Sequence, residues 1–489
     1  MLIPLSILSV LASPLLPLQA QGLAATRKTP TLQQGSGAPL RALQSRPRRV
    51  VPTPLRQDLI DPLTITVNGA SVPATPVSSL PALPHGPGWF NLSTPVPNQS
   101  VPELFVLGLP DMAVAGPGKR PLLVVFHQFN VSQGDAILNT EFLAETQARG
   151  WYLLGPLSRS PVGNPTINYG SKESQEFTRA GLDWVLDNYP IDRSRIYGVG
   201  FSMGGAAATS FAARHMDPKA GMFAALVDHT GSVDQVDTYT AFLQQGAEDL
   251  LETIFGGGPV PIDYKYRRSS CIELDPNTLD VLSGGTHMAI NLTHVPTQFW
   301  WATGDSLTYL VNQTEEFASL LGSFPGAVVD LNPVQSAVHS WDTMPAVDVC
   351  DWLDGQQLSV PLQGRIITDH DGRWYHFDVT ADVPDDFAAF GYELDPAIGL
   401  ISIMATEGIQ SIGLDLRDWG TATSDLPLTI KFDALDSGDV LVIKGISTSP
   451  GSVTRDGVAT SVGWFHNPFA DTLTVAENFT GTHTWTFLP

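Results

Sequence analysis

Apolar runs alternate with helix-like segments through the middle of the chain, and this alternation constrains the fold more than any other feature. The continuous apolar runs at 121–126 and 195–199 are typical of strands buried on both faces. Strands separated by helices of about 10–15 residues predict a doubly wound α/β sheet, in which functional side chains follow the carboxyl ends of strands. The predicted strands cover 89–93, 104–108, 121–126, 151–154, 195–199, 222–227, 298–302 and 327–331, and the predicted helices cover part of 133–149, then 171–188, 203–215 and 346–353.

One predicted strand runs directly into Gly200-Phe-Ser-Met-Gly204, which an alanine-rich helix follows. A serine between two glycines at a strand-to-helix turn is typical of a nucleophile elbow, because glycine has no side chain to collide with neighbouring elements. The turn exposes the Ser202 hydroxyl, and the helix N-terminus directs its free N–H groups to the same point. The pattern predicts a nucleophilic serine; the alternative is a Gly/Ser turn without chemistry.

A serine hydroxyl needs a base within hydrogen-bond reach and a third group that orients the base. In this architecture the chain order is serine, acid, histidine. Asp305 follows the predicted strand 298–302, and His339 follows 327–331. We therefore predict a triad of Ser202, Asp305 and His339. The alternatives are His215, His229 and His294 for the base and Asp234 and Asp237 for the acid, whereas Asp342 is too near His339 along the chain to orient it.

Acyl transfer also requires donors for the oxyanion. The first predicted donor is the N–H of Met203, directly after the nucleophile, and the second lies in the loop that begins at His127. Phe129 is the first choice in that loop and Gln128 the second.

With these residues in place, the chain resembles the α/β-hydrolase superfamily. More narrowly, it resembles secreted esterases of the polyhydroxybutyrate depolymerase and feruloyl esterase group, with prolyl-oligopeptidase-like hydrolases as relatives. The resemblance rests on 122–130, 197–205, 303–305 and 338–341, and spans roughly 85–356. One departure is that the family usually reads His-Gly after the third strand, whereas this chain has His127-Gln128, so a side chain narrows the oxyanion loop.

The N-terminal part differs in composition from the rest. Residues 1–22 begin with an uncharged apolar stretch, which predicts a secretory signal; a membrane anchor is the alternative, disfavoured by three prolines. Residues 23–57 are basic and Pro-rich, which predicts a disordered linker or pro-segment, with a basic binding arm or a processing site at 46–49 as the alternatives. The formal net charge of -23 argues against a nucleic-acid partner. We expect an exported protein, extracellular or periplasmic, without an integral membrane segment; its oligomeric state is left open.

An insertion at 231–293 interrupts the alternation and contains a predicted helix over 239–255. In this architecture such an insertion is predicted to act as a lid, with a decorative excursion as the alternative. Cys271 lies in the insertion and Cys350 in the helix after His339, and two cysteines in an exported protein predict one disulfide. Trp341, Phe201 and Phe129 are predicted to contact substrate, with core packing as the alternative.

From 357 to 489 short alternating runs with turn signals predict an all-β, sandwich-like accessory domain. It either binds a polymer through exposed aromatics, such as Trp374, Trp419 or Trp464, or packs against the catalytic unit. The Asp369–Gly372 segment partly matches a calcium loop but lacks the later glutamate, so a turn is predicted.

Together these features predict a catalytic domain over 58–356 that acts as a serine hydrolase on carboxylic esters. The expected substrate is a polyester, such as a polyhydroxyalkanoate or an aromatic polyester, or a feruloyl or short acyl ester. The alternatives are a secreted peptidase of the prolyl-oligopeptidase-like type and a non-catalytic adhesion protein on a hydrolase scaffold. Neither a metal nor an organic cofactor is implied.

Overall fold

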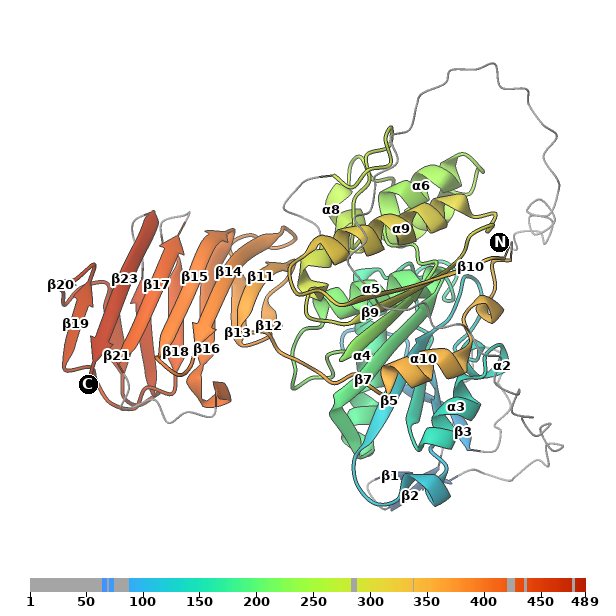
Figure 1. Cartoon of the computed structure of the whole chain (residues 1–489), viewed down its shortest axis with the longest axis horizontal. Coiled ribbons are helices and arrows are strands. Elements are labelled where there is room, and N and C mark those ends of the chain that lie inside the picture. The colour runs from blue at the N-terminus through green and yellow to red at the C-terminus, as the bar shows by residue number, and fades with distance from the viewer. Residues whose placement is uncertain are drawn as a thin grey trace, which may run out of the picture. The chain divides into compact units, whose positions relative to one another are not determined.

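The structure is a computed structural model, and it describes residues 64–67, 70–73, 88–282, 288–336, 338–419, 427–434, 438–476 and 480–489 (Figure 1). The chain divides into the units Met1–Gln57 and Asp58–Pro489. The described residues begin at 64, so the predicted secretory signal over 1–22 and the predicted linker over 23–57 lie outside them. Among the described helices, none has the length and apolar composition needed to cross a bilayer.

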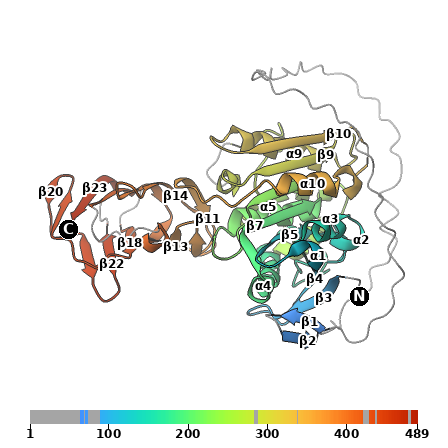
Figure 2. The same ribbon diagram turned by 60° about the horizontal axis from the view of Figure 1, so that its bottom comes forward.

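Within the described residues, an eight-stranded sheet has the order β10-β9-β8-β7-β5-β6-β4-β3, which Figure 2 shows from one edge to the other. Strands β5 to β10 run parallel to their neighbours among themselves, and β4 runs antiparallel to both β3 and β6. The strands are β3 (Trp89–Thr94), β4 (Glu103–Gly108), β5 (Arg120–Phe126), β6 (Tyr152–Pro156), β7 (Ile191–Phe201), β8 (Ala225–His229), β9 (Thr297–Ala302) and β10 (Val329–Val334). A separate hairpin pairs β1 (Thr64–Val67) with β2 (Ala70–Pro73), and a short helix α1 (Met112–Ala115) precedes β5.

Helices cover both faces of this sheet, which explains the uninterrupted apolar strands. Leu122 and Val124 of β5 point into one core with Phe211 of α5, whereas Leu123 and Val125 point into the other core. The predicted α/β class is therefore confirmed. The first core packs against α4 (Lys172–Asn188), α5 (Met203–Arg214) and α9 (Thr308–Ser323), and the second against α2 (Asp135–Leu138), α3 (Phe142–Arg149) and α10 (Ala346–Leu353).

Two helical features differ from the prediction. The insertion holds α6 (Gln235–Leu243) and α7 (Asp249–Phe255) in place of one helix over 239–255, followed by α8 (Asp263–Arg267). Gly246 adopts φ +68° between α6 and α7, a conformation that ends a helix. Helix α9 was not predicted, although its buried Leu310, Thr314, Phe317 and Leu321 follow helical spacing.

Beyond α10, the regular structure of the described residues is mainly strand, and we call residues 363–488 the β region. One sheet has the order β11-β14-β15-β17-β23-β19-β20 and the other β12-β13-β16-β18-β22-β21. Their facing side chains meet, as where the Phe377 ring lies 5.2 Å from that of Phe390. The strands are β11 (Gln363–Thr368), β12 (Gly372–Trp374), β13 (Phe377–Ala381), β14 (Ala388–Asp395), β15 (Leu400–Glu407), β16 (Ile409–Asp415), β17 (Leu428–Ala434), β18 (Val440–Lys444), β19 (Ser452–Arg455), β20 (Val458–Ala459), β21 (Trp464–Asn467), β22 (Thr472–Ala476) and β23 (Gly481–Leu488).

The three tryptophans predicted as adhesive contacts have different environments. Trp374 is wholly buried in the core, so its predicted exposure is wrong. Trp464 is half-buried and packs its ring 6.0 Å from that of Phe487. The side chain of Trp419 lies outside the described residues.

The predicted disulfide is wrong, because Cys271 and Cys350 are both free, buried thiols. Cys271 belongs to the core beside α4 and α5, and Cys350 belongs to the core on the opposite face of the sheet. Burial raises the pKa of each thiol to about 12. The cysteine count indicated a pair, but only the fold decides on which side of a sheet each cysteine lies.

A buried carboxyl in β4 predicts that the protein loses stability as the pH rises. Burial raises the pKa of Glu103 to about 8, despite N–H donors from Ser158 and Arg159. Between about pH 4.5 and 8 the folded state therefore holds a proton that the unfolded state has released, and the free energy of unfolding falls by up to about 5 kcal/mol. We expect Glu103→Gln to flatten this fall in chemical denaturation series across that range; an unchanged slope would show that Glu103 is ionised when folded.

Candidate active site

The turn between β7 and α5 has the close backbone contacts that the Gly-x-Ser-x-Gly pattern predicts. Ser202 stands at φ 57° and ψ -121° as the residue before α5. A Cβ at Gly200 would lie 2.0 Å from the Gly204 carbonyl oxygen, and a Cβ at Gly204 would lie 2.4 Å from the Phe126 carbonyl oxygen. Both glycines are therefore required by backbone that passes too close for a side chain. The first turn of α5 packs directly against the end of β5 and the start of the next loop.

Asp305 and His339 form a hydrogen-bonded pair at the ends of neighbouring strands. His339 Nδ1 lies 2.6 Å from Oδ2 of Asp305, and the Leu307 N–H donates to Oδ1 at 2.9 Å. Burial alone would raise the pKa of the Asp305 carboxyl, but these two donors outweigh it and hold the pKa below its usual value. A proton held on Nδ1 leaves Nε2 of His339 as the nitrogen that can accept a hydroxyl proton.

Ser202 and His339 are brought into one neighbourhood through the residue between them. The Phe201 ring lies 4.5 Å from the His339 ring, so the imidazole packs on the side chain that precedes Ser202. Within the described residues, the Ser202 hydroxyl makes no hydrogen bond to His339. Such contacts often tighten only when substrate binds. Phe201 is fully buried, so its predicted contact with substrate is wrong; it supports the imidazole instead.

Trp341, two residues after His339, also has a supporting position. Its ring lies 5.1 Å from that of Phe201 and 6.1 Å from that of Phe142, and it is buried. The indole N–H donates to Oδ2 of Asp135 at 3.0 Å. These contacts correspond to core packing, the alternative interpretation of Trp341, and its contact with substrate stays a prediction.

The loop after β5 is held at Gln128 from both sides of its backbone. The Gln128 N–H donates to Oδ2 of Asp135 at 3.0 Å. The Gln128 carbonyl oxygen lies 2.8 Å from Nδ1 of His127, whose Nε2 lies 2.7 Å from the Leu157 carbonyl oxygen. Because its N–H already has an acceptor, Gln128 is wrong as an oxyanion donor.

The same contacts orient the next N–H. In a trans peptide the carbonyl and the following N–H point in opposite directions, so the Phe129 N–H points away from the His127 ring. Within the described residues, neither the Phe129 N–H nor the Met203 N–H has a hydrogen-bond acceptor. The close packing of Gly204 on the start of this loop brings the two segments together. This arrangement supports the predicted donor pair of Phe129 and Met203.

Asp135 connects the oxyanion loop to the segment that carries His339, and nothing in the sequence motifs singled it out. This buried carboxylate receives donors at both oxygens: the Gln128 N–H and the Trp341 indole at Oδ2, and the Asn139 amide at Oδ1, 2.6 Å away. A carboxylate that accepts several hydrogen bonds can fix the geometry of all its partners. The signal that could have found it is its position at the first turn of the helix that follows the loop.

We expect Asp135→Asn to lower kcat for ester hydrolysis by about 10- to 100-fold, since removing one oxyanion donor costs more and this change only displaces it. Both oxygens of Asp135 accept N–H donors, so the NH2 group of an asparagine side chain would face one of these donors in either orientation of the amide. Steady-state kinetics, with the melting temperature recorded alongside, measures the effect. Asp183→Asn, which alters an exposed carboxylate paired with Arg179, is the control. An unchanged kcat in folded Asp135→Asn would contradict the role.

An apolar cluster lies beside the predicted oxyanion donors. The half-buried Phe129 ring lies 6.3 Å from that of Tyr169, which lies 5.8 Å from that of Phe242 in α6 of the insertion. The Met203 side chain belongs to the same cluster. We call Phe129, Tyr169, Met203 and Phe242 the aromatic wall. Tyr169 adopts φ +44°, a strained conformation for a non-glycine residue, and sequence reasoning missed it.

The alternative base His229 is buried beneath the site, and neither ring nitrogen has a hydrogen-bond partner within the described residues. Burial, with the neighbouring His339 as a second cause, lowers the pKa of His229 to about 3. Its carbonyl oxygen accepts the Ser202 N–H at 2.9 Å, so its backbone supports the elbow. In the part of the chain that the structure describes, no group of three or more His, Cys, Asp or Glu side chains is arranged to hold a metal ion.

Comparison with known proteins gives fold-level likenesses only. No protein-family model matches the chain, and no curated protein matches it. Solved structures similar to it include an S-formylglutathione hydrolase from Agrobacterium tumefaciens (14% identity, TM-score 0.41, 54% of this chain and 94% of the other). Others are a bacterial heroin esterase (16%, 0.40, 55% and 83%) and an acylaminoacyl peptidase from Pyrococcus horikoshii (15%, 0.39, 54% and 40%). Similarity this low carries no argument about what this chain does.

Proposed function

We propose that the chain is a serine hydrolase of the α/β-hydrolase type that cleaves carboxylic esters. The observation that carries the proposal is the 2.6 Å contact between His339 and Asp305, with the His339 ring packed on Phe201 immediately before the Ser202 elbow. The Phe129 and Met203 N–H groups, which lack acceptors within the described residues, supply the electrostatic part of such a site. These groups are the parts that acyl transfer to a serine requires.

In the proposed reaction, the Ser202 oxygen attacks the ester carbonyl carbon while His339 Nε2 takes the hydroxyl proton. Asp305 stabilises the resulting imidazolium, and the Phe129 and Met203 N–H groups bind the oxyanion. The C–O bond to the alcohol then breaks, the alcohol leaves with the proton from His339, and an acyl-enzyme remains. Water, deprotonated by the same imidazole, attacks the acyl carbon and returns the hydroxyl to Ser202.

The aromatic wall favours an ester whose acyl part is apolar or aromatic, because the group attached to a carbonyl held by Phe129 and Met203 must lie beside those side chains. Feruloyl and short acyl esters and polyesters are all within this class. Peptide cleavage by the same triad is the second candidate; the sequence contains no propeller-like repeat that would gate a peptidase site, which favours esters.

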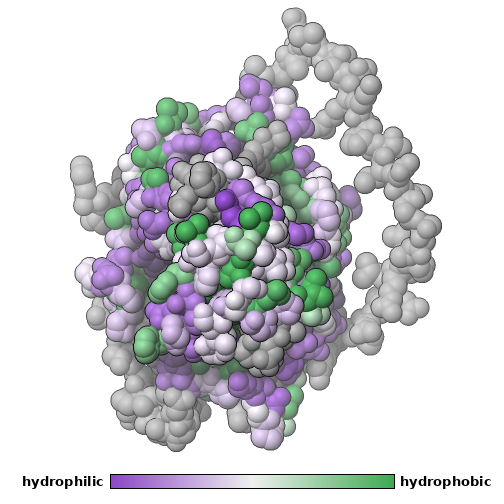
Figure 3. Space-filling view, turned by 90° about the vertical axis from the view of Figure 1, so that its left-hand side faces the viewer, coloured by the Kyte–Doolittle hydropathy of each residue, from purple (hydrophilic) through white to green (hydrophobic). Residues whose placement is uncertain are grey.

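Attachment to a polymer is a further part of the proposal, supported by apolar side chains at one end of the β region. Phe469 is 99% exposed in the turn after β21, and Val458, Val462 and Phe465 are exposed nearby. Figure 3 looks at the molecule from this end and shows apolar residues scattered among polar ones. Exposed aromatic and aliphatic groups on a protein surface often mark contact sites. Export to the extracellular space or the periplasm is proposed from the apolar N-terminal stretch alone.

The test is hydrolysis of p-nitrophenyl butyrate by the full chain, together with reaction with a fluorophosphonate and peptide mapping of the modified residue. We expect turnover and a single phosphonylated serine at Ser202. Aminoacyl p-nitroanilides, tested in parallel, distinguish an esterase from a peptidase. Absence of turnover on both substrate types, with Ser202 unmodified, would contradict the proposed hydrolase and support the hypothesis of a non-catalytic adhesion protein.

A further inference from the structure

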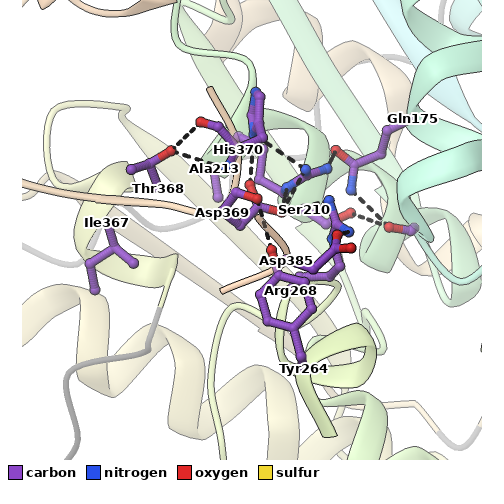
Figure 4. A network of polar contacts seen from close by, with 12 residues as sticks. Gln175, Ser210, Ala213, Tyr264, Arg268, Ile367, Thr368, Asp369, His370 and Asp385 are labelled. Carbon is purple, nitrogen blue, oxygen red and sulfur yellow. Dashed lines mark hydrogen bonds and ion pairs between the residues drawn. The ribbon is translucent and has the colours of Figure 1, made fainter. Parts of the chain in front are cut away.

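A buried charged cluster joins the β region to the insertion and to the helix behind the elbow (Figure 4). At its centre is Asp369, in the turn after β11, whose side chain is 0% exposed. Arg214 donates to Oδ2 of Asp369 from Nε at 2.8 Å, Arg268 Nη2 lies 2.9 Å from the same oxygen, and His370 Nδ1 lies 2.7 Å from Oδ1. We call Asp369, Arg214, Arg268 and His370 the Asp369 cluster.

The charge on Asp369 is held in place by its neighbours. Burial alone would raise the pKa of the Asp369 carboxyl, but Arg214, His370 and Arg268 outweigh it and hold the pKa well below its usual range. A buried carboxylate with two buried arginines is expensive to desolvate, so it is weak evidence for added stability. Its geometric consequence is stronger, because each arginine is bound to a different part of the molecule.

The first connection leads into the insertion. Arg268 directly follows α8, and Tyr264 within α8 donates its hydroxyl to the Asp369 carbonyl oxygen at 2.8 Å. The Arg268 guanidinium also lies over the Tyr264 ring, 5.2 Å from its centre. Tyr266 of the same helix packs its ring 4.4 Å from that of Phe255, in the apolar cluster that contains the aromatic wall. The Asp369 cluster therefore fixes α8, the helix that packs behind the aromatic wall.

The second connection leads to Tyr169 of the wall itself. Arg214 is the last residue of α5, the helix that begins directly after Ser202, and its Nη1 donates to Oε1 of Gln175 at 2.7 Å. The Gln175 amide in turn donates to the Gly170 carbonyl oxygen at 2.8 Å. Gly170 follows Tyr169, and a Cβ there would lie 2.3 Å from Ser210 Oγ of α5. The strained Tyr169 turn is thus held by a continuous chain of contacts from Asp369.

We propose that Asp369 is a positioning residue for the acyl side of the active site, so that the β region takes part in substrate selection. This inference rests on the function proposed above. Two sets of contacts hold different parts of the site: Asp135 and His127 hold the peptide before the oxyanion N–H, whereas the Asp369 cluster holds the insertion and the Tyr169 turn. Loss of the contacts made by the Asp369 cluster changes how well a large acyl group fits, and it leaves the hydrolysis of esters with a small acyl group unchanged.

The experiment compares kcat/KM for p-nitrophenyl acetate, whose acyl group is too small to extend to Tyr169 and Phe242 of the wall, with that for p-nitrophenyl cinnamate. In Asp369→Asn we expect kcat/KM for the cinnamate to fall about tenfold or more, while the acetate value is unchanged. Gln175→Glu is a second variant that keeps an acceptor for Arg214 but places an oxygen against the Gly170 carbonyl. The same selective fall is expected there, without removal of the buried carboxylate, so the test holds if Asp369→Asn does not fold.

Lys219→Ala is the matched control, because Lys219 makes a 2.6 Å ion pair with Asp418 of the β region, a contact that does not include the Asp369 cluster. Its cinnamate-to-acetate ratio should equal that of the wild type. Equal changes for both esters in folded Asp369→Asn and Gln175→Glu, or no change in either, would overturn the inference. Failure of the wild type to hydrolyse either ester overturns the proposed function instead, so the two failures are distinct.

Discussion

Ser202→Ala is expected to lower kcat for p-nitrophenyl butyrate on the order of 10⁶-fold, with the melting temperature close to that of the wild type. The reason is that the Ser202 hydroxyl is the proposed nucleophile, so the covalent path is lost with it. What remains is the stabilisation of a water-attacked oxyanion by the two N–H groups, which is a small part of the total. Steady-state hydrolysis and loss of fluorophosphonate labelling measure the change.

Ser174→Ala is the matched control for this variant. Ser174 is a buried serine of α4 whose hydroxyl donates to the Ser171 carbonyl oxygen at 2.8 Å, a contact within the first turn of that helix. We expect it to retain wild-type kcat. Should Ser202→Ala retain more than a small fraction of the activity, the nucleophile would have to be another residue and the mechanism proposed here would be wrong.

Asp305→Asn is expected to lower kcat by about 10⁴-fold, as for an orienting acid in other serine hydrolases. The two oxygens of Asp305 both accept, one from the Leu307 N–H and one from His339 Nδ1. An amide that keeps its oxygen toward Leu307 presents NH2 to Nδ1. This contact moves the imidazole proton to Nε2, which can then no longer accept the proton of Ser202.

The measurement is kcat for p-nitrophenyl butyrate, with the extent of fluorophosphonate labelling as a second readout, since labelling also needs the base. Asp351→Asn removes an exposed carboxylate that pairs with Arg149 at 2.7 Å and should leave both readouts unchanged. A loss of less than tenfold in Asp305→Asn would indicate that another group orients His339, and it would remove Asp305 from the proposed triad.

Local patterns predicted most of the α/β part. Helix α10 was predicted with its observed bounds, and the apolar run at 121–126 became the centre of the sheet because both faces of β5 are covered. The need for glycine at the two flanking positions of the elbow could be predicted from the sequence, since only a residue without a side chain permits such close backbone contacts. The order of Ser202, Asp305 and His339 after successive strand ends was equally a matter of chain position.

The failures share a cause. Phe201 was assigned to substrate from its neighbours along the chain, yet it is fully buried and supports the His339 ring. The sequence makes Gln128 a candidate oxyanion donor, but its N–H donates to Asp135, seven residues away along the chain. The two cysteines formed a reasonable pair by count and lie in opposite cores. In each case the environment of the residue is set by another element, and the local sequence pattern does not predict how that element packs.

The sequence by itself therefore determined where strands end, where a backbone needs glycine and which side chains follow those ends, because these depend on residues within a few positions. Only the tertiary structure decided which partner each polar group has, as at Asp135 and Asp369. Such partners are separated by tens to hundreds of residues and meet only after the sheet, the insertion and the β region have packed.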